Sequence, residues 1–301
     1  MPRQKGVAHA LLVTAIAGGL VASASAQQSV SLAGVIDFHT HAGPDSRARS
    51  VNDIEAAIQA KAAGVRGLVF KNHFTMTADR AALAMHQVDG IEIFGGVVLN
   101  RAVGGLNSEA VRQMVAFEGG RGKVVWLPTF DAEYYVKAHG LSDPFVSVVE
   151  AGRPAPALAE IFGLIATHEL VLAMGHSSPE EVLLLIPEAQ RLGVRHILIT
   201  HVFGQAPTRD QMRRMAESRA VMELDWYAVY QGRRTLADYA SAIREIGAEH
   251  FLISSDLGQE GSPSHTEGLR AFIHALREEG ISDGDVHMMA GVNPAKLLGL
   301  R

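Results

Sequence analysis

The stretch DFHTH, residues 37–41, ends a short apolar run and decides how the rest of the sequence is interpreted. Side chains of an extended strand alternate between its faces, so His39 and His41 project to the same side about 7 Å apart. Two imidazoles at that spacing can bind one metal ion. They also fit ordinary polar positions of a strand, so the pattern needs support from other segments.

Strand-like segments recur along the chain. Most are short, nearly continuous apolar runs rather than alternating ones. Such runs are typical of parallel strands that are covered on both faces. The predicted strands span residues 35–41, 66–73, 92–99, 123–130, 170–176, 196–201, 220–226 and 250–256.

Segments with helical periodicity lie between these strands, for example residues 51–63, 179–192 and 208–218. Several end in a Gly that stops the helix before the next strand. Eight alternations in about 270 residues predict a (β/α)8 TIM-type barrel formed by residues 27–301 as a single domain. An open doubly wound sheet is the alternative, but no Gly-rich phosphate loop follows the first strand. The long interval 131–169 is typical of a segment that covers an active site.

The N-terminal segment has the features of a secretory signal peptide. Arg3 and Lys5 precede an apolar run, residues 7–21, and the small residues 22–26 follow it. This pattern predicts cleavage after Ala26 and a periplasmic or secreted protein. A membrane anchor is the alternative, but a run of about fifteen residues is short for a span of roughly 20.

Charge and cysteine content restrict the partners. Removal of residues 1–26 changes the formal net charge from −5 to −7, which argues against nucleic acid or anionic lipid as a partner. The chain has no Cys, so disulfides and thiolate metal ligands are excluded. The expected partner is a small-molecule substrate, with no membrane contact after cleavage, and a homo-oligomer is left open.

Polar residues stand at the carboxyl ends of five predicted strands, and these ends converge on one mouth in a (β/α)8 barrel. A single His at the end of a strand is more often structural. Several such histidines, with an Asp at the end of the last strand, are much less often a coincidence. Imidazole and carboxylate ligands suit Zn²⁺ first, with Mn²⁺, Fe²⁺ or Ni²⁺ as alternatives. The residues are His39 and His41, Lys71 and His73, His176, His201, and Asp256.

The order of these residues resembles the amidohydrolase superfamily of metal-dependent hydrolases. An HxH pair ends strand one, single histidines end strands five and six, and Asp ends strand eight. The tail GVNPAKLLGL, residues 291–300, is similar to the closing helix of that superfamily. The stretch beginning DFHTHAGPDSRARS is similar to a branch of unknown function. The resemblance covers residues 34–300.

This resemblance implies roles for the residues. His39, His41 and Asp256 would hold the first metal ion, and His176 and His201 would hold a second ion or, in one-metal members, contact substrate. Asp256 would take a proton from metal-bound water, whose pKa Zn²⁺ lowers towards about 7.

The bridging ligand departs from the superfamily pattern. Two-metal members generally carry a carboxylated Lys or a Glu at the end of strand four, where this chain offers only Asp131. Lys71 on strand two is the better candidate for a carboxylated bridge. A substrate contact or a structural ion pair are its alternative roles, so one or two ions per chain are expected.

Further residues are candidates for substrate contact. They are His73 on strand two and Tyr134 and His139 in the long interval, although the loop aromatics are equally compatible with local packing. Glu223 and Asp225 near the end of strand seven reach the mouth by register, and one of them is a further candidate.

Three functions remain open at this point. The leading hypothesis is a hydrolase in which metal-activated water cleaves an amide, ester or lactone-type bond, with Asp256 and His201 as catalytic residues. A one-metal decarboxylase or lyase is the second, and there His201 would be catalytic rather than ligating. The third is a non-catalytic periplasmic metal-binding protein. Fold alone does not decide among them.

Overall fold

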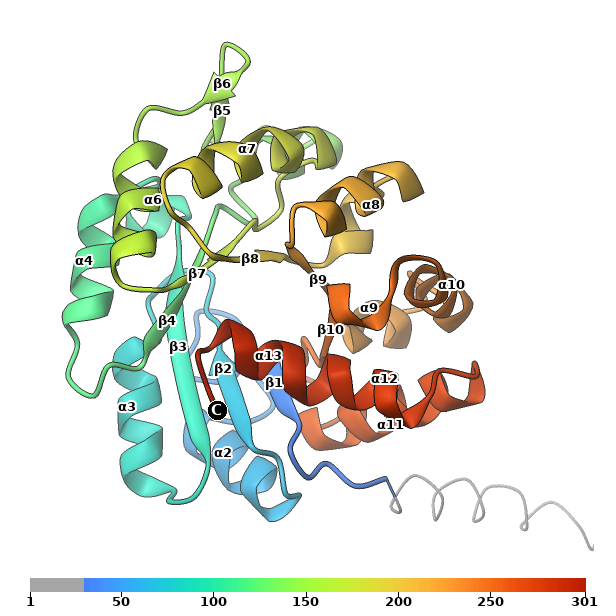
Figure 1. Cartoon of the computed structure of the whole chain (residues 1–301). Helices are drawn as coiled ribbons and strands as arrows, with labels where there is room; N and C mark the ends of the chain where they lie inside the picture. The colour runs from blue at the N-terminus through green and yellow to red at the C-terminus, as the bar shows by residue number, and fades with distance from the viewer. Residues whose placement is uncertain (1–29) are drawn as a thin grey trace, which may run out of the picture.

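Eight parallel strands surround the centre of the protein in a computed structural model that describes residues 30–301 (Figure 1). Each strand pairs in parallel with the next one along the chain, which confirms the predicted (β/α)8 barrel. The strands are β1 (Ile36–Thr40), β2 (Gly67–Phe70), β3 (Glu92–Val98), β4 (Gly122–Trp126), β7 (Val171–Ala173), β8 (His196–Ile199), β9 (Val221–Asp225) and β10 (Phe251–Ser254).

The barrel closes between β1 and the segment that follows β10. Thr40 forms a parallel bridge with Leu257. The N–H of His41 donates to the carbonyl oxygen of Leu257 at 2.9 Å, and the N–H of Asp256 donates to that of His39 at 3.0 Å. The seam of the barrel therefore runs through residues that the sequence assigns to the site.

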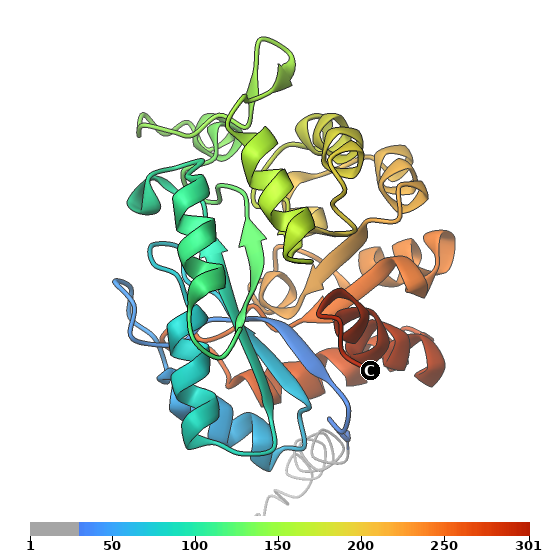
Figure 2. The ribbon, with the colours of Figure 1, turned by 60° about the vertical axis from the view of Figure 1, so that its left-hand side comes forward.

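Helices connect the strands and cover the outside of the barrel (Figures 1 and 2). The three helical segments expected from the sequence form α2, α7 and α8, and each begins with a capping box that satisfies free N–H groups of its first turn. The helices are α2 (Asp53–Ala62), α3 (Ala78–Gln87), α4 (Ser108–Ala116), α6 (Leu158–Thr167), α7 (Pro179–Arg191), α8 (Arg209–Glu217), α9 (Trp226–Tyr230), α10 (Leu236–Ile246), α11 (His265–Glu278) and α12 (Asp283–His287), with short turns at η1 (Arg101–Val103), η2 (Val202–Gln205), η3 (Ala248–His250) and η4 (Met288–Val292).

Apolar side chains fill the barrel interior. Phe38 and Trp126 are among the largest, and both are almost fully buried. The last helix, α13 (Asn293–Leu297), packs Ala295 and Leu297 against this interior cluster. The Asn293 amide donates to the carbonyl oxygen of Phe251 at 2.6 Å, where β10 begins. Helix α13 thus covers the amino-terminal end of the barrel and leaves the carboxyl-terminal end for a site (Figure 1).

The connection between β4 and β7 is the longest in the barrel. It contains α5 (Glu133–Ala138) and an antiparallel hairpin, β5 (Val149–Glu150) and β6 (Arg153–Pro154), which projects away from the barrel (Figures 1 and 2). The interval predicted as a loop also includes α6, an ordinary barrel helix. The part that can cover the mouth therefore ends before residue 158.

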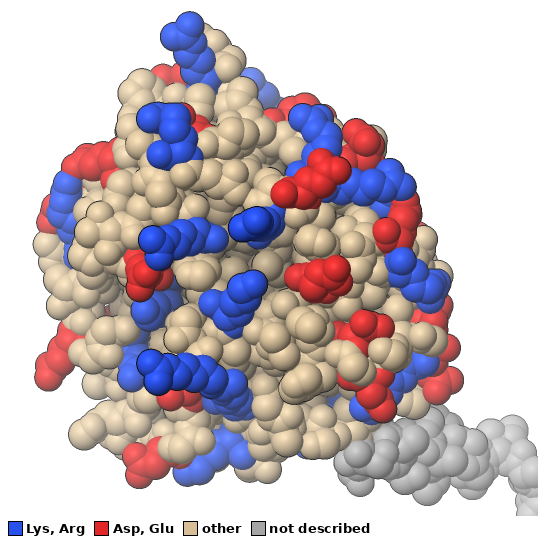
Figure 3. All heavy atoms as spheres, in the orientation of Figure 1, with Lys and Arg blue, Asp and Glu red and all other residues tan. Residues whose placement is uncertain are grey.

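Charged side chains of both signs lie around the edge of the face seen in Figure 3, and several basic ones lie across its middle. Within residues 30–301, no helix combines the length and apolar character needed to cross a membrane. The signal peptide expected at residues 1–26 lies outside the described residues, so its cleavage and the periplasmic or secreted location stay predictions.

Candidate metal centre

An irregularity in β1 places the two histidines of the DFHTH stretch. Ile36 and Phe38 pack inside the barrel, so strict alternation would turn His39 outward. The register shifts here: Asp37 pairs with Leu68 and Thr40 pairs with Phe70, so three residues along β1 correspond to two along β2. The extra residue is a bulge, which redirects side chains. The sequence predicted that the two histidines share a side of the strand, but not the bulge that turns this side toward the centre.

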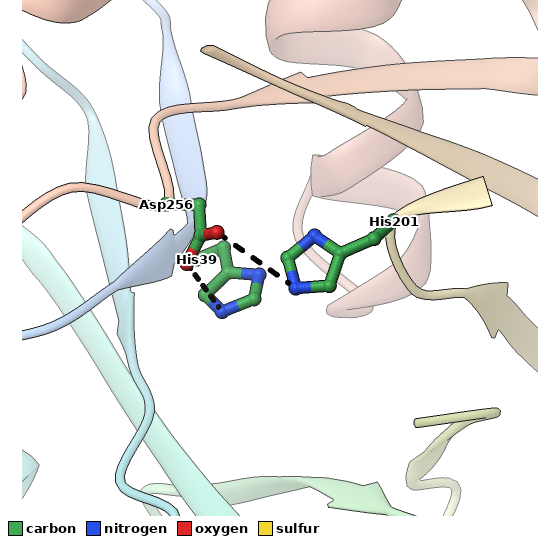
Figure 4. A group of neighbouring side chains, drawn as sticks. All are labelled: His39, His201 and Asp256. Atoms are coloured by element: carbon green, nitrogen blue, oxygen red, sulfur yellow. Dashed lines mark ion pairs between the residues drawn. The ribbon is translucent and has the colours of Figure 1, made fainter. Parts of the chain in front are cut away.

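Four of the predicted ligands converge on one point. The Nε2 atoms of His39 and His41 lie 3.2 Å apart, and each lies 3.1 Å from Oδ1 of Asp256. His201 Nε2 lies 3.8 Å from the other oxygen, Oδ2, so the rings of His39 and His201 face the carboxylate from two sides (Figure 4). His201 and Asp256 both adopt positive φ angles, 46° and 49°. Such backbone strain is concentrated at functional sites.

The second ring nitrogens of these histidines contact acceptors. Nδ1 of His39 lies 2.9 Å from Oε1 of Glu223, and Nδ1 of His41 lies 2.9 Å from the carbonyl oxygen of Lys71. A carboxylate or carbonyl oxygen only accepts, so these two contacts assign the proton to each Nδ1 and turn the lone pair of each Nε2 to the centre; Nη2 of Arg49 also lies 3.4 Å from Nδ1 of His41. Metal-binding histidines in proteins are usually held in this way.

Lys71 and His176, the two remaining predicted ligands, lie beside this centre. Lys71 is 1% exposed, and its Nζ has no hydrogen-bond partner among the described residues. Burial lowers the pKa of Lys71 to about 8, although the negative charges of Asp256 and Glu223 act to raise it. Nδ1 of His176 is likewise buried without a partner, and its ring centre lies 5.6 Å from that of His201. Their side chains therefore offer two uncommitted polar atoms.

Burial and neighbouring charges shift the protonation of the centre. Burial lowers the pKa of both His39 and His41 well below the usual value, so these rings are neutral. Burial also raises the pKa of Asp256 to about 6 and that of Glu223 to about 7. Although burial opposes its charge, the carboxylates of Asp256 and Asp225 raise the pKa of His201 to about 9.

The predicted substrate residues occupy three different positions. His73 lies in the site, where its ring stacks on His41 with centres 5.0 Å apart. The Tyr134 hydroxyl donates to the carbonyl oxygen of Gln205 at 3.4 Å, which joins α5 to the loop after β8. His139 is exposed and stacks on Tyr135, 4.1 Å between centres. The structure therefore places His139 outside the centre.

Two further aromatic residues, Tyr135 and Phe130, border the centre. The Tyr135 ring lies 5.1 Å from that of His176. The Phe130 ring lies 4.3 Å from that of His73 and 5.6 Å from that of His176. Phe130 ends the fourth strand-like run, and that position was a signal the sequence analysis did not use. Glu223 and Asp225 are both buried, and each contacts a histidine, His39 and His201 respectively.

The fold is a (β/α)8 barrel, as predicted, and histidines and acids from several strands gather at its mouth. The chain belongs to a family of unknown function, DUF6282, whose model matches residues 34–223. No curated protein matches the sequence significantly.

Solved structures with similar folds include three enzymes at low sequence identity. A probable 2-pyrone-4,6-dicarboxylic acid hydrolase from Acinetobacter baumannii has a TM-score of 0.62 and 13% identity, over 89% of this chain and 100% of that chain. An organophosphorus hydrolase from Deinococcus radiodurans has values of 0.60 and 16%, over 89% and 93%. A 2,6-dihydroxybenzoate decarboxylase from Rhizobium has values of 0.52 and 12%, over 89% and 99%. At these identities the likeness establishes the fold.

Proposed function

We propose that this protein is a metal-dependent hydrolase in which His39, His41 and Asp256 hold a divalent ion. The observation that carries the proposal is the cluster of three acceptor atoms, Nε2, Nε2 and Oδ1, within 3.1–3.2 Å of one another. With both protons on Nδ1, neither Nε2 carries a proton, and acceptors that face one another in a buried site repel unless a cation lies among them. Ligands about 2.1 Å from one ion lie roughly 3.4 Å apart in tetrahedral geometry, close to the observed separations.

A second ion would use His176, His201 and Lys71. Unpartnered buried atoms in a native fold require an explanation such as an ion or a modification, and Nζ of Lys71 and Nδ1 of His176 are two of them. Burial keeps part of Lys71 as the neutral amine, the form that reacts with carbon dioxide to give a carbamate. A carboxylated Lys71 would supply the bridge that strand four lacks.

When bound, the ion would activate water and polarise a carbonyl group of the substrate. The protein supplies the proton transfer. Asp256 has a pKa of about 6, so at neutral pH its carboxylate can accept a proton at Oδ2. The protonated ring of His201 faces that oxygen, and its positive charge stabilises the carboxylate. Together they would move the proton to the leaving group of an amide, ester or lactone-type small molecule.

A one-metal decarboxylase is the second candidate. Among the described residues, the group whose ligand atoms all lie within 4.8 Å of one another is His39, His201 and Asp256, which amounts to one centre. The Rhizobium structure with a similar fold is a decarboxylase. In this alternative His39, His41 and Asp256 would hold the single ion. His201 would not ligate; its ring, protonated at neutral pH and close to Asp256, would deliver a proton to substrate carbon.

Metal analysis combined with a substrate panel tests the proposal. Purified protein loaded with Zn²⁺ or Mn²⁺ is expected to hold one or two ions and to hydrolyse an amide, ester or lactone. His39→Asn should lose most bound metal and activity, whereas His168→Asn, an exposed histidine at the end of α6, should match wild type. Wild-type protein that binds no divalent ion would refute the metal centre. Metal binding with carbon dioxide release from aromatic acids and no hydrolysis would favour the decarboxylase.

A further inference from the structure

The two acids of β9 stand two residues apart and point into the same side of the barrel. Their side chains are 1% exposed for Glu223 and 7% for Asp225. Each contacts the nitrogen of a histidine that faces away from the metal centre, Glu223 at His39 and Asp225 at His201. Strand β9 itself supplies no predicted ligand to the centre.

Glu223 connects three elements of the site. Oε1 accepts from Nδ1 of His39 at 2.9 Å and from the hydroxyl of Ser254 at 2.7 Å. Oε2 accepts from the backbone N–H of His201 at 3.3 Å. These contacts use both oxygens and reach β1, β10 and the end of β8. Glu223, at 1% exposure, is therefore fixed among these three elements.

Asp225 is fixed by contacts with α9 and α10. Its Oδ1 accepts the N–H of Ala228 at 2.8 Å and so caps α9, and the Tyr239 hydroxyl donates to its carbonyl oxygen at 3.2 Å. The other oxygen, Oδ2, lies 3.4 Å from Nδ1 of His201 in an ion-pair contact. The contact is not a hydrogen bond, so Asp225 acts on Nδ1 through its charge, and Nε2 of His201 is turned towards Asp256.

We propose that Glu223 and Asp225 are positioning residues: β9 fixes the ring orientation of His39 and His201 so that each Nε2 is presented to a metal ion. An anionic partner at Nδ1 also makes Nε2 a stronger ligand, because it stabilises the positive charge that the ring acquires. The inference rests on the proposed metal centre and adds to it the strand that organises the ligands. Neither acid touches the reacting atoms.

Metal affinity of isosteric variants tests the roles directly. Glu223→Gln and Asp225→Asn keep the shape and remove the charge, and loss of such a partner typically weakens metal binding 10–100-fold. We expect Glu223→Gln to raise the dissociation constant of the tightest Zn²⁺ at least tenfold, measured by competition with a chromophoric chelator at pH 8. Asp225→Asn should raise at least tenfold the dissociation constant of the Zn²⁺ ion that the His201→Gln variant no longer binds.

The matched control is Glu92→Gln, a partly buried acid that starts β3 and pairs with Arg121 at the amino-terminal end of the barrel, away from the centre. It should bind Zn²⁺ as wild type does. A dissociation constant within threefold of wild type for Glu223→Gln or Asp225→Asn would overturn that half of the proposal. Failure of wild-type protein to bind Zn²⁺ would instead overturn the proposed metal centre.

A measurement on metal-free wild-type protein covers the case in which a variant does not fold. Long-range ¹H–¹⁵N spectra of the imidazoles distinguish the two neutral tautomers. At pH 8.5 we expect His39 to carry its proton on Nδ1, as the contact with Glu223 requires. A proton on Nε2 would overturn the role of Glu223.

Discussion

The backbone N–H of Asp256 donates to the carbonyl oxygen of His39 at 3.0 Å, so two residues from opposite ends of the chain meet at the seam of the barrel. Their side chains approach at the same place, with Oδ1 of Asp256 3.1 Å from Nε2 of His39. An ion that binds these side chains would therefore also hold β1 against the end of β10. Metal binding and closure of the barrel are thus expected to be coupled.

The first prediction is that metal stabilises the fold. Zn²⁺ at about 100 times its dissociation constant contributes about 2.7 kcal/mol if it binds only the native state. For a domain of this size that corresponds to a rise in Tm on the order of 5 °C or more. Differential scanning calorimetry of chelator-treated protein, with and without Zn²⁺, measures the rise. His39→Asn serves as control and should show almost no shift, and an equal shift in that variant would disprove coupling through this site.

The barrel can be predicted from the sequence because the patterns that specify its strands and helices are local and repeated. Apolar runs recur eight times with helical periods between them, several of the helices end in a Gly, and the observed strand order follows from this alternation. The convergence of His39, His201 and Asp256 follows from the rule that strand ends meet at one mouth.

The contacts between side chains could not be predicted in the same way. The bulge in β1 depends on the register of β2, and the pairing of Glu223 with His39 depends on how far the two strands are inclined. No pattern within either strand encodes these relationships. The same limit applies to His139: its position in the long interval did not show that it stands exposed just after α5, with its ring stacked on Tyr135.

A second prediction concerns Lys71→Met. Because Nζ of Lys71 is buried without a partner, replacing the amine by an apolar chain of similar length should leave the metal-free protein as stable as wild type, or more stable by about 1–3 kcal/mol. If Lys71 is a carboxylated bridge, the variant should lose one of two bound ions. It should also lose the carbamate ¹³C resonance that wild type shows with labelled bicarbonate. Retention of two ions would exclude the bridge.

A third prediction is that metal binding releases a proton from His201. The pKa of His201 is about 9 in the metal-free protein, so the ring is charged at pH 7, and a ligating Nε2 must lose its proton. Affinity for the ion that uses His201 should therefore increase about tenfold per pH unit up to pH 9 and level off above it. Calorimetric titration at pH 7 in two buffers of different ionisation enthalpy measures the protons released. His201→Gln should release about one proton fewer, and an unchanged count would argue against this ligand.

A fourth prediction concerns the ion pair that holds the loop after β1. Arg80 donates to both oxygens of Asp53, at 2.6 and 2.9 Å, and to the carbonyl oxygen of Ala42. The pair is almost buried, so Arg80→Met would leave an unpaired acid and should cost about 3–5 kcal/mol in urea unfolding. The exposed pair of Arg195 with Glu169 offers the comparison, since Arg195→Met should change stability by less than about 1 kcal/mol. Equal effects of the two substitutions would contradict this account.

The last prediction concerns Gly258, which lets the loop after β10 approach His41. Its φ is +112°, and a Cβ there would lie 1.7 Å from the His41 carbonyl oxygen. That oxygen also accepts from Nε2 of His265 at 2.9 Å, so it has little room to move. Gly258→Ala should cost at least about 3 kcal/mol, from the left-handed backbone and the clash together. It should also weaken metal binding by displacing His41.

Gly261→Ala separates these two causes, because Gly261 has a φ of +78° and open space where a Cβ would lie. It should cost only the backbone penalty, about 1–2 kcal/mol, and should bind Zn²⁺ as tightly as wild type. Urea unfolding and chelator competition on the two variants measure both quantities. If Gly258→Ala bound metal as well as Gly261→Ala, the close approach to His41 would have no part in shaping the site. The position of His41 would then depend only on β1 and on the carbonyl group of Lys71.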